Sequence, residues 1–142
     1  MPHPDLDQLL KILLPFAHQT LANHGELIPF GLSMKTDGTI VANVAYEKEH
    51  APSQEIVDLL AQAFRQSALN AEIRAAGICY DTRVTPPGET QLSDAICASL
   101  EHQSGDAMDV FVPYAKAPRG EISYRELFAI RHIPQLFIAR IG

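Results

Sequence analysis

The fold is decided by the stretch Asp94-Ala-Ile-Cys-Ala-Ser-Leu-Glu-His-Gln-Ser-Gly-Asp-Ala-Met-Asp-Val-Phe-Val-Pro-Tyr114. Every second residue on either side of its Gln-Ser-Gly turn is apolar. This alternation predicts two antiparallel strands that share one buried face. A three-residue loop ending at Gly105 would pair His102 with Asp106 and Leu100 with Met108.

Two further turns end in glycine in the same way, at Gly38 and Gly120. The first predicts a hairpin over 30–46, in which Met34 faces Ile40. Because this register buries one clean apolar face, we prefer a three-residue loop to a two-residue Asp-Gly loop.

The turn at Gly120 predicts a last strand over 121–131. Its register pairs Tyr114 with Tyr124 and Val110 with Phe128. Independent turns therefore agree on the buried face, and this agreement predicts an antiparallel meander.

Residues 4–24 carry leucines at helical spacing, with Asp5 or Asp7 available to cap the start. We expect Pro15 to kink this helix or to divide it in two. Gly25 supplies the left-handed residue that ends it.

A polar connection at 47–52 precedes a second helix, about 53–72, which Ser53 caps. A third strand follows, roughly 72–85, and consecutive prolines end it.

These elements predict a single α+β domain spanning residues 1–142. We expect two layers, with two helices on one face of an antiparallel meander of five or six strands, in the order α-β-β-α-β-β-β-β. The tail, 133–142, is apolar, so it either packs on the domain or meets another chain.

The composition excludes several classes of protein. The chain has 142 residues, 46% of them apolar, and a net charge of −6. This balance argues against binding to a nucleic-acid backbone. With no signal-peptide pattern, no membrane span and no CxxC, we expect a cytoplasmic protein that meets no membrane.

Most catalytic and cofactor motifs are missing from the sequence: there is no Walker loop, dinucleotide fingerprint, HExxH or GxSxG. His18 and His24 fall on different faces of their helix, so they are poor joint ligands. We therefore predict no catalytic residue, no cofactor and no metal.

Candidate binding residues follow if Cys79 pairs near Ser99. Asp81 and Arg83 would then share a face with Ser99 and Glu101. That face would be either solvated, with local ion pairs, or a shallow binding or dimer surface.

Glu126 breaks the apolar pattern, because the predicted register places it opposite Val112. It could lie at a sheet edge in water or bond Tyr80 or Tyr124. Alternatively, Ser123 and Glu126 could form a capping box, or Glu126 could be a perturbed functional carboxylate.

The order helix, hairpin, helix and meander resembles the layout of roadblock and profilin-like domains. The chain also resembles small bacterial proteins of uncharacterised function, some of which resemble immunity or accessory proteins. This second resemblance lies in Pro29-Phe-Gly31, Asp37-Gly38, Asp94-Ala-Ile96, Leu100-Glu-His102 and Pro113-Tyr114.

The preferred function is a non-catalytic protein-binding module of a bacterial cytoplasm, whose partner is a second copy or another protein. One alternative is an immunity-type protein that neutralises a toxin. The other is a small hydrolase or transferase that uses Asp81, Glu101 or Glu126.

Overall fold

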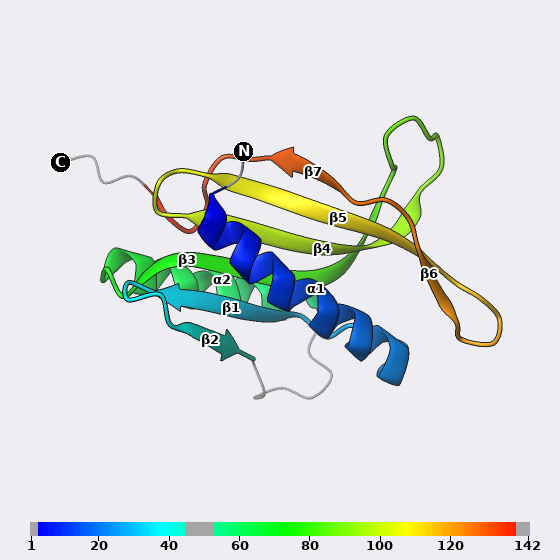
Figure 1. Ribbon diagram of the computed structural model, residues 1–142, viewed down its shortest axis with the longest axis horizontal. Helices are drawn as coiled ribbons and strands as arrows, with labels where there is room; N and C mark the ends of the chain where they lie inside the picture. Colours follow the sequence, from blue (N-terminus) through cyan, green and yellow to red (C-terminus); the bar gives the residue numbers. More distant parts are fainter. Residues whose placement is uncertain (1–2, 45–52, 139–142) are drawn as a thin grey trace.

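Two helices and one antiparallel sheet make up the computed structural model, which describes residues 3–44 and 53–138 (Figure 1). The predicted α+β class, number of helices and order of elements are confirmed. The strand end at Tyr46, the connection 47–52 and residues 139–142 of the tail lie outside the described residues. The elements are α1 (Pro4–His24), β1 (Phe30–Lys35), β2 (Ile40–Asn43), α2 (Ser53–Leu69), β3 (Ile73–Val84), β4 (Ser93–His102), β5 (Ala107–Lys116), β6 (Ile122–Tyr124) and β7 (Phe128–Arg131).

The sheet has seven strands in the order β2-β1-β3-β4-β5-β6, and β7 also pairs with β5. The prediction of five or six strands was wrong because the strand expected over 121–131 is two short strands. The chain leaves strand conformation between Tyr124 and Phe128, so β6 and β7 lie one after the other along β5.

The registers that follow from the glycine turns are confirmed. Leu100 pairs with Met108, and the equivalent pairs Met34–Ile40 and Tyr114–Tyr124 also form. Beyond β6 the prediction fails: Val110 pairs with Ala129 and not with Phe128. The break between β6 and β7 shifts the chain by one residue.

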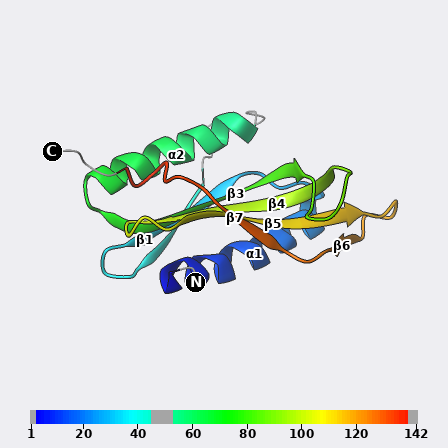
Figure 2. The ribbon, with the colours of Figure 1, turned by 90° about the horizontal axis from the view of Figure 1, so that it is seen from above.

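The helices cover opposite faces of the sheet, which corrects the expectation that both lie on one face (Figure 2). The physical reason lies in β3, which is apolar at both parities over Ala75–Cys79. Ala75 and Cys79 pack in the cluster under α1, whereas Ala76 and Ile78 pack in the cluster under α2. A strand with no polar face requires cover on both sides.

The start of α1 is capped by His3 rather than by Asp5 or Asp7. The Asp5 backbone N–H donates to His3 Nδ1 at 3.1 Å, and Gly25 ends the helix in the left-handed conformation at φ +73°. The helix runs without interruption through Pro15. Among the described helices, none is long and apolar enough to span a membrane.

Each helix approaches the sheet at a glycine. A Cβ on Gly31 would lie 2.7 Å from Phe64 Cζ of α2, and one on Gly77 would lie 2.8 Å from Leu13 Cδ1 of α1. The two glycines belong to neighbouring, paired strands and open toward opposite faces. These gaps in the side-chain layer set how closely the helices pack.

We predict that Gly31→Ala lowers the free energy of unfolding by about 1–3 kcal/mol, because the new methyl group overpacks the Phe64 contact. Urea titration measures this effect. Phe64→Leu in the same chain should recover part of the loss, since the ring no longer fills the gap. Strictly additive losses in the double variant would contradict the contact.

Candidate functional site

The structure places the residues of the predicted binding face on two opposite faces of the sheet. In the β3–β4 ladder, Cys79 lies opposite Ala98 and not beside Ser99. A shift of one residue moves a side chain to the other face. Asp81 and Arg83 therefore lie on the α1 face, whereas Ser99 and Glu101 lie on the α2 face.

On the α1 face, Asp81 accepts a hydrogen bond of 2.8 Å from the Tyr114 hydroxyl. Burial raises the pKa of the Asp81 carboxyl, and the Tyr114 bond opposes that rise. Arg83 pairs with Asp94 at 3.3 Å on an exposed surface. No nucleophile or histidine contact with Asp81 is found among the described residues, so this pair fits local structure.

Glu101 is a buried acidic residue, with 2% of its surface exposed. Its carboxylate accepts backbone N–H bonds from Gln135, Leu136 and Phe137 at 2.8–3.3 Å. Consecutive backbone N–H groups form a concave anion site of the kind called a nest. Glu101 therefore fastens the first part of the tail to the sheet, and Leu136 is buried beneath α2.

Glu126 is exposed and lies in the connection between β6 and β7. The alternative of a sheet-edge position in water is therefore the one that the structure supports. The capping-box alternative is wrong, because Ser123 belongs to strand β6. The predicted pairing of Glu126 with Val112 does not form.

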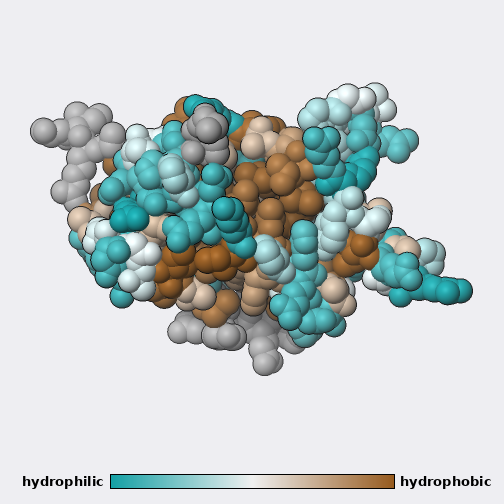
Figure 3. Space-filling model, in the orientation of Figure 1, coloured by the Kyte–Doolittle hydropathy of each residue, from teal (hydrophilic) through white to brown (hydrophobic). Residues whose placement is uncertain are grey.

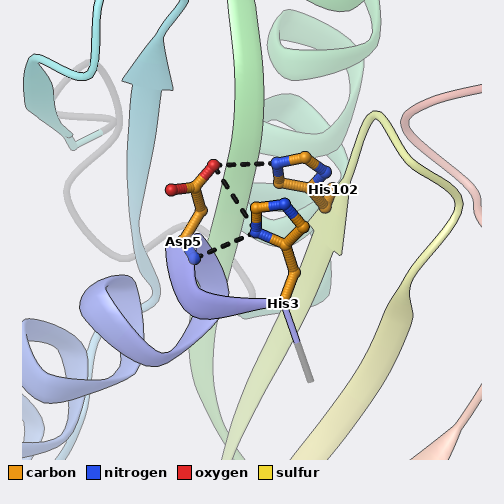
Figure 4. A group of neighbouring side chains, drawn as sticks. All are labelled: His3, Asp5 and His102. Atoms are coloured by element: carbon orange, nitrogen blue, oxygen red, sulfur yellow. Dashed lines mark hydrogen bonds and ion pairs between the residues drawn. The ribbon is translucent and has the colours of Figure 1, made fainter. Parts of the chain in front are cut away.

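A cluster that sequence reasoning missed joins the start of α1 to the end of β4 (Figure 4). His3, Asp5 and His102 each offer a ligand atom, and these atoms lie within 4.8 Å of one another. Arg74 also donates to both carboxylate oxygens of Asp5, at 3.1 and 3.3 Å. Arg74 sits at an irregularity in the β1–β3 register, which turns its side chain toward α1.

The hydrogen bonds of His102 decide what this cluster can do. The Ser104 N–H donates to Nδ1 at 3.0 Å, so Nδ1 must be the acceptor. Nε2 then carries the proton and donates to Asp5 Oδ2 at 2.8 Å. A metal at Nε2 would move that proton to Nδ1, against the Ser104 N–H. The donor atoms therefore fit a tether between α1 and β4 better than a metal centre.

A second group missed by sequence reasoning lies on the α2 face, where β4, β5 and β7 extend beyond the helix. His132 Nε2 lies 3.2 Å from Asp109 Oδ1 and 3.5 Å from Ser99 Oγ. Beside them Phe111 stacks on Phe128 with ring centroids 5.2 Å apart. We call this surface the open face and define it by Ser99, Asp109, Phe111, Phe128, Ile130 and His132.

The polar side chains of the open face, Ser99, Asp109 and His132, do not form a catalytic triad. His132 Nδ1 lies 2.9 Å from the Ile133 carbonyl oxygen, which can only accept, so Nδ1 carries the proton. Ser99 and Asp109 then compete for the single remaining nitrogen. A serine–histidine–aspartate triad needs them on opposite nitrogens of the ring.

A hollow of about 560 Å³ lies between the end of α2, the β4–β5 turn and the tail. Its walls include Ala68, Gln103, Ser104 and Phe137. No ionisable side chain is among the described residues that line it. It offers apolar contact and a few polar groups, with no acid or base among the described side chains that line it.

The two thiols do not make a reactive site. Cys79 and Cys97 are free and buried, and they lie on opposite faces of the sheet. Burial raises the pKa of the Cys97 thiol to about 12 and that of Cys79 further. Both thiols therefore stay protonated near neutral pH.

Comparisons with protein-family models, with curated proteins and with solved structures found no match to this chain. The site must therefore be interpreted from its own geometry.

We predict that Glu101→Gln lowers the free energy of unfolding by about 1–3 kcal/mol, because the neutral amide accepts fewer of the backbone N–H groups. Hydrogen exchange should accelerate at the amides of 135–137. Glu126→Gln is the matched control, and its effect should stay within about 0.5 kcal/mol. Equal effects of the two substitutions would contradict the anchoring role of Glu101.

We also predict opposite pH dependences for two aspartates. Burial raises the pKa of Asp5, but hydrogen bonds from His102 and Arg74 outweigh it and lower that pKa below 3.8. Ionised Asp5 thus stabilises the fold above pH 3.8, and this contribution is lost as pH falls through the lowered pKa. Asp81 has a raised pKa, so its ionisation above 3.8 destabilises the fold.

Urea midpoints measured from about pH 2 to about pH 6 test this contrast. The advantage of the wild type over Asp5→Asn should grow as pH rises. Its advantage over Asp81→Asn should shrink. Parallel profiles for the two variants would refute at least one of the two assignments.

Proposed function

We propose that this chain is a non-catalytic protein-binding module, and that its partners include a second copy of the chain. The observation that carries the proposal is the width of the sheet relative to its helices. An α-helix is about 10 Å across and strands lie about 4.8 Å apart, so one helix covers about two strands. Six strands lie side by side along the main path of this sheet, and each face has one helix.

The uncovered strands carry apolar side chains. On the open face, Ile130 is 55% exposed and Phe128 is half-buried. On the other face, Figure 3 shows apolar surface over β5 and β7 beside α1. Exposed apolar patches with a polar border are typical of protein-interaction surfaces.

The arrangement of carboxylates argues against the hydrolase or transferase alternative. Asp81 and Glu101 lie on opposite faces, and Glu126 lies in an exposed connection. A shared catalytic pocket would require at least two of them near one histidine. The net charge of −6 agrees with an immunity-type protein that binds a basic toxin, but the described residues do not favour that partner specifically.

We further propose that the module acts in a bacterial cytoplasm. The two buried thiols suit a reducing compartment, since their positions on opposite faces keep them from bonding to each other.

The proposal predicts that Ser99→Arg, on the β4 side of the open face, abolishes binding of the partner. A tagged chain would be cross-linked in its native host, and captured proteins would be quantified by mass spectrometry. Gln62→Arg adds the same side chain to the exposed side of α2 and is the matched control.

A partner that the wild type and Gln62→Arg capture, but Ser99→Arg does not, is the expected result. A set of captured proteins that is the same for all three chains would overturn the use of the open face.

A further inference from the structure

We propose that two copies of this chain associate through β7, which joins their sheets into one across a two-fold axis. This inference deepens the proposed function, because it names the surface that a second copy uses. β7 pairs with β5 along one edge, and Ala129, Ile130 and Arg131 are exposed. An edge strand presents unpaired N–H and C=O groups to another chain.

The outward backbone groups follow from the register. The His132 N–H donates to the Ala107 carbonyl of β5 at 3.1 Å, so the backbone groups of His132 point inward. Backbone groups alternate in direction along an antiparallel strand. Those of Arg131 and Ala129 therefore point away from β5, toward a partner.

This alternation restricts the two-fold pairing. If Ala129 pairs with Ala129 of the partner subunit, the two residues exchange both of their backbone hydrogen bonds. Phe128 then lies opposite Ile130 of the partner subunit. Both side chains are on the open face, because they pair with Phe111 and Asp109 of β5. The pairing thus buries an aromatic side chain against the exposed Ile130 twice, once on each side of the axis.

The residue at the two-fold axis also fits this register. Ala129, at the axis, is small enough to avoid a clash on the α1 face. A surface that is complementary to itself is what a two-fold dimer requires.

The experiment combines sedimentation equilibrium with cross-linking on the full chain. The wild type should sediment at twice the 15.6 kDa monomer mass. Ala129→Pro removes an outward N–H, which an edge strand tolerates, and should raise the dimer dissociation constant at least about tenfold.

Ala42→Pro is the matched control. The Lys35–Thr39 hydrogen bond places Ala42 at an outward position of β2, the strand at the other edge of the sheet. This variant should remain dimeric. Circular dichroism confirms that both proline variants stay folded.

A cysteine substitution tests the register even if a proline variant unfolds. Ala129→Cys should form a disulfide-linked dimer on mild oxidation, since paired residues lie about 5.5 Å apart at Cα. Ala42→Cys should not, and the native cysteines are both buried.

A wild type that is still monomeric at about 100 μM would overturn the dimer. Cross-links that form in Ala42→Cys but not in Ala129→Cys would overturn it as well. A monomeric wild type would also remove the second copy from the proposed partners. Binding to another protein has its own test, which measures whether Ser99→Arg abolishes capture of that protein.

Discussion

The structure depends on the packing of two helices against the opposite faces of one central strand. β3 can bury both faces because a glycine on β3 and a glycine on the paired strand β1 each leave space for a helix side chain. Leu13 of α1 fits over Gly77, and Phe64 of α2 fits over Gly31 on the paired strand. Close packing of this kind gains many dispersion contacts and leaves little room for substitution. The positions of both helices, and hence of the uncovered strands, follow from these two contacts.

Two carboxylates then attach α1 and the residues after β7 to this framework. Asp5 accepts from His102 and Arg74, which ties α1 to β3 and β4. Glu101 binds consecutive N–H groups of the tail on the other face. A buried carboxylate is tolerated only when its oxygens receive hydrogen bonds. Both carboxylates accept such hydrogen bonds, and each one holds two parts of the fold together.

One helix on each face leaves parts of a wide sheet open, and the proposed function rests on that imbalance. The open face carries Phe111, Phe128 and Ile130 together with a polar group around His132. The edge of β7 adds backbone groups that pair with no described strand to the same region. Apolar surface and a free strand edge together favour association with protein over chemistry on a small substrate.

The hairpins could be predicted from the amino-acid sequence, because a three-residue turn ending in glycine fixes the pairing of the residues beside it. This rule predicts three pairs that the structure contains, which are Leu100–Met108, Met34–Ile40 and Tyr114–Tyr124. The β3–β4 register could not be predicted in this way and came from the fold, because the long loop between Val84 and Ser93 imposes no spacing. It also decided the faces of the helices and the cluster of His3, Asp5 and His102. These contacts join residues far apart in the chain, so they cannot be predicted from the local pattern of apolar residues.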